Sequence, residues 1–274
     1  MNNSIPETHP LAISVVEAIK NGDVAGLRQL LSENPNLAGV SIHDKENDAT
    51  RSLLHVATDW PGHFPNVSET ICLLITAGAD VNAGIEGADT ETPLHWAASS
   101  NDVAAIDVLL DGGANMDVQG AVIAGGDPLE DAIGFQNWDA AKRLVERGSK
   151  TGLGDEAAIG LMDKIEKRFE DVPLPSRDNI VYSFWNACCA GQLEPAKFLL
   201  GKGADVNWIP DWCDTSPLDG AIKSENKELV EWLKAHGQSE TKNSRGGVTG
   251  KRVRMIELGN VTAGNYVESS KAIY

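Results

Sequence analysis

The chain has 274 residues, 42% of them hydrophobic, and its formal net charge at pH 7 is −17. The hydrophobic fraction is that of a folded chain, which argues against wholesale disorder. The acidic balance argues against nucleic acid as a ligand, because carboxylates repel the phosphate backbone.

The charge is divided unevenly along the chain. Residues 240–274 carry six Lys or Arg and three Asp or Glu, so this tail has a net charge of +3 and the rest has −20. A net charge of this size chiefly serves solubility, and it also favours a basic protein as partner. No apolar run reaches the roughly 18 residues of a membrane span, and the first residues lack the features of a signal peptide. We therefore expect a cytoplasmic protein that does not enter a membrane.

Two short helices are predicted first, over residues 11–20 and 27–31, with the break at Asn21-Gly22-Asp23 between them. Residues 38–50 are polar and predict a long connection. A second helix pair follows, in which residues 58–66 (Thr-Asp-Trp-Pro-Gly-His-Phe-Pro-Asn) form an expanded turn. Prolines and a glycine stiffen this turn around three aromatic or imidazole side chains.

The clearest helix pair lies over residues 92–117. Thr92-Pro93 predicts a helix start, since proline at the first helical position loses no hydrogen bond. Asn101-Asp102 predicts the break and the cap of a second helix, whose apolar residues recur at helical spacing. Gly113 follows where the chain must turn left-handed.

A fixed spacing identifies further repeats. His95 lies 18 residues before Gly113, and the same spacing separates Glu130 from Gly148, Trp185 from Gly203, and Asp219 from Gly237. His55 lies 23 residues before Gly78, which is a repeat with five extra residues. These units, with the first pair of helices, predict six repeats.

Two stretches do not follow the repeat. Residues 150–180 separate the fourth and fifth repeats, and residues 155–169 within them predict one extra helix, with Ile159, Met162, Ile165 and Phe169 along one stripe. Residues 240–274 predict a flexible linker and a short strand over 252–258. The expected domains are therefore 1–239, with the insertion 150–180, and the tail 240–274.

The run Thr92-Pro93-Leu94-His95-Trp96-Ala97-Ala98, followed by Gly113-Ala114-Asn115, resembles an ankyrin repeat. The resemblance covers about residues 10–239 and implies an all-α fold, an ankyrin-repeat α-solenoid of about six helix pairs with an extra helix inserted between repeats four and five. It further implies that His55 and His95 tie neighbouring repeats together by hydrogen bonds.

The resemblance implies a function in protein–protein interaction, with the partner bound in the concave face of the array. That face is made of the turn tips and the exposed side of each first helix, and aromatic side chains beside small ones suit a partner's protruding side chain. The candidate binding residues are Asp59, Trp60, His63, Phe64, Asp89, Glu91, Ser99, Ser100, Phe135, Trp212 and Asp214.

A second hypothesis is a small-molecule binding protein or enzyme. Its pocket would be built by the 59–66 loop and the 150–180 insertion, with Asp59 and His63 as acid and base and Ser99 and Ser100 as polar contacts. A third is that the basic tail binds the acidic body and regulates access to it. No metal-ligand spacing and no phosphate-binding loop is present, so neither a metal nor a cofactor is expected.

The four cysteines, Cys72, Cys188, Cys189 and Cys213, have no disulfide-framework spacing. They are interpreted as reduced core residues of a cytoplasmic protein, with Cys188 as a small core residue at an alanine position of the fifth repeat. Trp96, Trp138, Trp185 and Trp232 replace usual repeat residues, and most of these indoles are expected between repeats.

Overall fold

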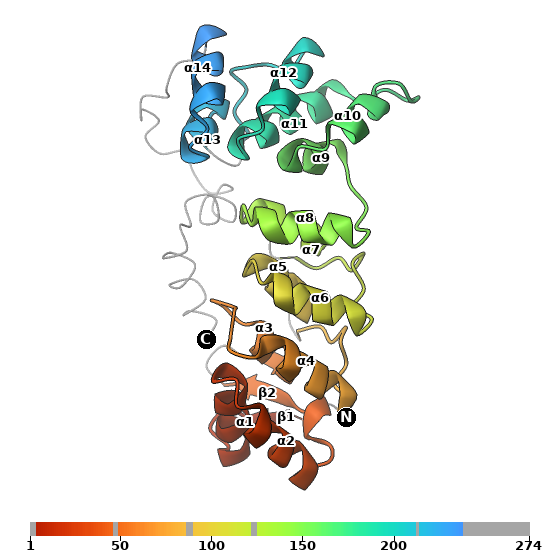
Figure 1. Ribbon diagram of the computed structural model, residues 1–274, viewed down its shortest axis with the longest axis vertical. Coiled ribbons are helices and arrows are strands. Elements are labelled where there is room, and N and C mark those ends of the chain that lie inside the picture. Colours follow the sequence, from red (N-terminus) through yellow and green to blue (C-terminus); the bar gives the residue numbers. More distant parts are fainter. Residues whose placement is uncertain (1–3, 46–48, 86–89, 122–124, 212–213, 238–274) are drawn as a thin grey trace. The chain divides into compact units, whose positions relative to one another are not determined.

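The computed structural model describes residues 4–45, 49–85, 90–121, 125–211 and 214–237. They form two compact units that meet in the sequence between Ser149 and Lys150. Each unit is an all-α solenoid of stacked helix pairs, and each pair consists of a first helix, a turn and a second helix (Figure 1). The linker and strand expected in residues 240–274 lie outside the described residues.

The described part of the first unit contains four helix pairs. They are α1 (Pro10–Lys20) with α2 (Val24–Glu33), α3 (Leu53–Thr58) with α4 (Val67–Thr76), α5 (Pro93–Ser99) with α6 (Val103–Asp111), and α7 (Pro128–Gly134) with α8 (Trp138–Glu146). The first helices α1, α3, α5 and α7 pack on one another in one layer, and the second helices pack in another. Leu54, Leu74, Leu94 and Ile106 are fully buried between these helices.

The helix starts are those that the sequence predicts. Pro93, Pro128 and Pro217 each begin a first helix. The backbone N–H before each proline donates to a side chain three residues further on. The acceptors are His95 for Thr92 (3.0 Å), Glu130 for Asp127 (3.1 Å) and Asp219 for Ser216 (3.1 Å). Such reciprocal caps satisfy N–H groups that have no partner within the helix.

A short 3₁₀ helix, η1 (Leu37–Gly39), and a small sheet occupy the segment that was expected to be a polar connection. β2 (Ser41–Asp44) pairs in antiparallel fashion with β3 (Ala49–Ser52) and in parallel fashion with β1 (Ser4–Pro6). Ile42 is 1% exposed. The segment connects the first and second helix pairs as expected, but its strands were not predicted, because the alternate burial along β2 is a pattern that four residues are too short to reveal in the sequence.

The described part of the second unit contains three helix pairs. They are α9 (Leu153–Ile159) with α10 (Met162–Arg168), α11 (Arg177–Cys189) with α12 (Leu193–Gly201), and α13 (Pro217–Lys223) with α14 (Lys227–Ala235). The first helices α9 and α13 both pack on α11. Phe184 and Cys188 of α11 are fully buried in the core of this unit, as expected for Cys188.

The prediction of one extra helix over residues 155–169 was wrong. Gly160 takes φ +79°, ends α9 and lets the chain turn back into α10, so the insertion is a complete helix pair. Ile159 and Ile165 are buried as the stripe predicts, but they lie on two helices rather than one. The described residues therefore hold seven helix pairs instead of the six expected. The turn was missed because the spacing of apolar residues does not distinguish a left-handed glycine from an ordinary helix residue.

Candidate functional site

Three of the four turns between the helices of a pair in the first unit are three residues long with a left-handed residue in the middle, and the turn 59–66 is longer. These turns comprise residues 21–23, 59–66, 100–102 and 135–137. Each contains a left-handed residue, which is Gly22 (φ 65°), Asn66 (54°), Asn101 (54°) or Gln136 (60°). Because α1, α3, α5 and α7 are stacked, the turns at their carboxyl ends follow one another, and we call them, with Ser99, the turn row.

The expanded turn 59–66 is attached to the repeat before it. Asn66 Nδ2 donates to the Gly22 carbonyl at 2.9 Å, and Lys20 Nζ lies 2.9 Å from Asp59 Oδ2. A Cβ on Gly22 would lie 2.1 Å from the Pro65 carbonyl oxygen, so only glycine allows this approach.

The same turn is attached to the repeat after it. The His63 backbone N–H donates to Asp102 Oδ2 at 2.6 Å, and a Cβ on Gly62 would lie 2.9 Å from the Cβ of Ser100. The backbone is thus held on both sides, while the His63 side chain stays 62% exposed and Trp60 and Phe64 are half-buried. A pre-ordered loop loses less conformational entropy when a partner binds.

Asp59 does not form the predicted acid–base pair with His63. Its side chain is 4% exposed and lies between two cations, with Lys20 at 2.9 Å and Arg51 Nη1 at 3.7 Å. His63 turns to the next repeat, where its Nδ1 lies 4.0 Å from Asp102 Oδ1. The two side chains are separated because Asp59 meets Lys20 of the preceding repeat and His63 faces Asp102 of the following one. Lys20 Nζ also lies 5.8 Å from the Phe64 ring centroid, within the range of a cation–π contact.

The turn row continues through the third and fourth repeats. Asn137 Nδ2 donates to the Ser99 carbonyl at 2.7 Å and to the Ala98 carbonyl at 3.0 Å. Ser99, Ser100 and Phe135 are half-buried at the ends of α5 and α7. The structure therefore brings seven of the eleven candidate residues onto one row: Asp59, Trp60, His63, Phe64, Ser99, Ser100 and Phe135.

The other four candidates are not assigned to this row. Glu91 is 8% exposed, and its carboxylate accepts a 3.0 Å hydrogen bond from Trp96 Nε1, so it supports the fold rather than an open surface. Asp89 and Trp212 lie outside the described residues, and Asp214 is exposed before α13 in the second unit. The 59–66 loop and the 150–180 insertion belong to different units, so the pocket that would join them stays a prediction.

The two repeat histidines have the role that was predicted for them. His55 Nε2 donates to the Glu91 carbonyl at 3.0 Å, and His95 Nε2 donates to the Gly126 carbonyl at 3.4 Å, which ties each repeat to the next. Both imidazoles are fully buried. Burial lowers the pKa of each to about 4, because the charged form is poorly solvated there.

An aromatic pair on the second unit was missed by the sequence analysis. Tyr182 and Trp185 of α11 are stacked, and Tyr182 is 39% exposed. The i,i+3 spacing of Tyr182 and Trp185 places both on one side of a helix, and this was the signal that the sequence offered. The pair was missed because Trp185 occupies the histidine position of the repeat and was expected between repeats.

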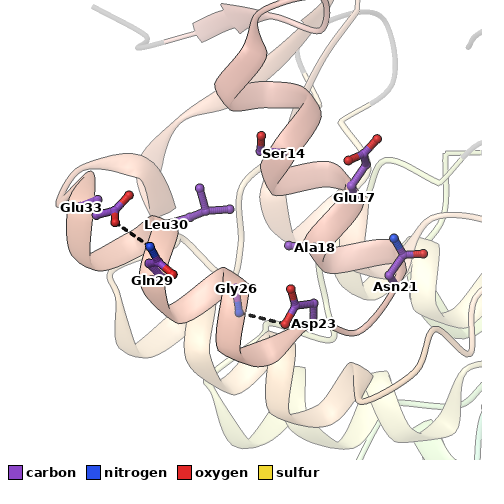
Figure 2. Close-up of a pocket in the computed structure, with 9 residues that line it drawn as sticks. All are labelled: Ser14, Glu17, Ala18, Asn21, Asp23, Gly26, Gln29, Leu30 and Glu33. Carbon is purple, nitrogen blue, oxygen red and sulfur yellow. Dashed lines mark hydrogen bonds between the residues drawn. The ribbon is translucent and has the colours of Figure 1, made fainter.

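A shallow hollow of about 390 Å³ lies between α1 and α2 and is lined mainly by polar side chains, among them Glu17, Asp23, Gln29 and Glu33 (Figure 2). Asp23 Oδ1 accepts from the Gly26 N–H at 2.9 Å and so caps α2. Among the described residues, no three metal-binding side chains gather in a way that could hold an ion, and no helix is both long and apolar enough to cross a membrane.

The cysteines divide by exposure. Cys188 and Cys189 are buried, whereas Cys72 is exposed on α4, contrary to the expectation that the cysteines are core residues. Cys72 follows buried Ile71 in α4, where neighbouring helical positions face different sides. Cys213 lies outside the described residues.

Comparison with known proteins identifies the repeat. The family described as "Ankyrin repeats (3 copies)" matches residues 54–155, which hold the helix pairs from α3 to α8 and the two repeat histidines. Residues 54–155 of this chain are ankyrin repeats. The human ASB11 ankyrin repeat domain is similar to it with a TM-score of 0.46 and 22% identity, over 88% of this chain and 89% of that one.

The curated relatives of this chain are much longer. Rabankyrin-5 is 38% identical in Homo sapiens and 28% identical in Mus musculus over 211 residues, which are 67% of this chain and 17% of each relative. Palmitoyltransferase ZDHHC13 of Mus musculus is 28% identical over 101 residues, 36% of this chain and 16% of the relative. The chain thus spans about a sixth of the length of these proteins. Ankyrin repeats in general mediate protein–protein interactions.

Proposed function

We propose that this protein binds a segment of a partner protein along the turn row of its first unit. The site expected from the sequence was the whole concave face. The proposed site is the part of it at the carboxyl ends of the first helices. The observation that carries the proposal is the 59–66 turn, in which the Asn66 side chain donates to the Gly22 carbonyl on one side and the His63 backbone N–H donates to Asp102 on the other.

The side chains along this row suit a partner. Trp60 and Phe64 offer partly exposed aromatic area, and such residues contribute much of the binding energy at protein interfaces. The next turn along the row presents the small side chains of Ser99 and Ser100, which leave room for a partner's side chain. The net charge of −17 favours a basic partner, and it would act on the association rate more than on affinity.

Trp60→Ser should weaken binding about 30-fold, which corresponds to the roughly 2 kcal/mol of an aromatic hot spot. Peptides would be selected from a random displayed library on the immobilised full chain, and their affinities measured by fluorescence anisotropy. Ser68→Ala is the matched control, because Ser68 is exposed on α4 outside the turn row. We expect it to change affinity less than twofold, since it removes no aromatic anchor.

Melting temperatures of both variants show whether the fold is kept. The proposal is wrong if the selected peptides bind the folded Trp60→Ser variant as tightly as the wild type. Selected peptides that lose affinity in Trp60→Ser and in Phe64→Ser, but not in Ser68→Ala, support it.

A further inference from the structure

The stacked pair of Tyr182 and Trp185 forms an exposed aromatic surface on the second unit. Their ring centroids lie 6.4 Å apart and their planes differ by 18°. The α11 residues after Trp185, from Asn186 to Cys189, are buried, whereas Tyr182 is 39% exposed and Trp185 is half-buried. The proposed interface on the turn row does not use this pair.

The two rings are held in place by the neighbouring first helices. Trp185 Nε1 donates to the Thr215 carbonyl, just before α13, at 2.8 Å. The Tyr182 ring lies against Gly154 of α9, where a Cβ would be 3.0 Å from Tyr182 Cε1. Both rings are therefore ordered before any ligand arrives, which lowers the entropic cost of binding.

Two exposed carboxylates lie near the pair along the chain. Asp178 is exposed on α11 and precedes Tyr182 by four residues, a spacing that places the two on one side of the helix. Asp214 is exposed and directly precedes Thr215, whose carbonyl holds the Trp185 indole. An aromatic floor with carboxylates beside it is complementary to a cation.

We propose that this surface, which we call the Tyr182–Trp185 face, binds an arginine side chain of a partner protein. The planar guanidinium stacks on the rings, and its N–H groups reach the carboxylates of Asp178 and Asp214. Arginine fits better than lysine because its charge is delocalised over a plane and it is more weakly hydrated. The site lies on the other unit from the turn row, so the two proposals can fail separately.

The test uses the full-length protein and a defined probe, the peptide acetyl-Gly-Ser-Arg-Ser-Gly-amide. Binding is followed by nuclear magnetic resonance through the Trp185 indole N–H signal, which is assigned by its loss in Trp185→Phe. We expect a saturable shift with this peptide, weakened by added salt, and none with the same peptide carrying uncharged citrulline. Equal shifts with both peptides, or none with either, would overturn the proposal.

Variants then assign the contacts. Tyr182→Leu keeps an apolar side chain but removes the π face, and it should weaken binding about fivefold. Asp178→Asn with Asp214→Asn should weaken binding and remove most of its salt dependence. Glu231→Gln, an exposed carboxylate on α14, is the matched control and should leave binding unchanged. Unchanged affinity in Tyr182→Leu, with the fold intact by circular dichroism, contradicts the assignment.

The same measurement separates a partner from the chain's own basic tail. Arg245→Gln, Arg252→Gln and Arg254→Gln are combined in the full chain. If the tail occupied the Tyr182–Trp185 face, the triple variant would no longer compete with the peptide. Peptide affinity would then rise severalfold, and the partner proposal would be wrong. Unchanged affinity supports a separate partner. Trp60→Ser should leave arginine-peptide binding intact, which keeps this result distinct from the test of the turn row.

Discussion

Acidification from pH 7 to pH 5 should destabilise the first unit by about 2 kcal/mol for each of His55 and His95, together about 4 kcal/mol. The folded pKa of both imidazoles is about 4, below the unfolded value of 6.5. Between these values the unfolded chain binds more protons than the folded chain. The stability is therefore fully present above pH 6.5 and is lost as the pH falls toward 4.

Burial is the main reason why the folded state resists protonation of His55 and His95, and the hydrogen bonds at Nδ1 act in the same direction. Nδ1 of His55 accepts from the Ser52 N–H at 3.2 Å, and Nδ1 of His95 accepts from the Thr92 N–H at 3.0 Å. A proton on Nδ1 would face these N–H groups and remove the cap of α3 and of α5. Buried imidazolium would in addition lack solvation, which is the larger effect.

Urea unfolding at several pH values measures this effect. In a variant with His55→Gln and His95→Gln the stability at pH 7 should be lower, but its loss between pH 7 and pH 5 should be much smaller than in the wild type. His43→Gln with His63→Gln is the matched control, because neither residue is fully buried. An equal loss in all three proteins would contradict the assignment and point to carboxylates instead.

Replacing Arg168 with Met should destabilise the second unit by about 3 kcal/mol. Glu156 of α9 is 2% exposed, and Arg168 of α10 binds its carboxylate at two points, Nε to Oε2 at 2.5 Å and Nη2 to Oε1 at 2.9 Å. Arg168 also donates to the Thr151 carbonyl. Without the guanidinium, the buried carboxylate keeps only the Thr151 hydroxyl at 2.8 Å.

Thermal or urea unfolding of three variants tests this ion pair. Lys167→Met removes an adjacent exposed charge from the same helix and should change the unfolding free energy by less than about 0.5 kcal/mol. Glu156→Gln combined with Arg168→Met should recover part of the stability, because no charge then remains buried. If Arg168→Met costs no more than Lys167→Met, the pair does not hold α9 to α10.

The turn row was partly predictable from the sequence. The repeat spacing placed the ends of the first helices, so Trp60, Ser100 and Phe135 could be assigned to equivalent positions. The way in which the turns are joined was not predictable. His63 contacts Asp102, and Asp59 contacts Lys20, and both contacts span 39 residues.

The sequence by itself determined the features that depend on neighbours along the chain. The helix starts at Pro93, Pro128 and Pro217 and the buried Cys188 follow from local capping, spacing and side-chain size, and the resemblance to ankyrin repeats implied the histidine ties. Only the tertiary structure decided which side chains face solvent and which carboxylate meets which cation. Those outcomes depend on how one repeat packs on the next. Packing brings together side chains that are far apart in the sequence, and no local pattern encodes which of them meet. Asp59 and Tyr182 are examples, one buried beside Lys20 and the other exposed on α11.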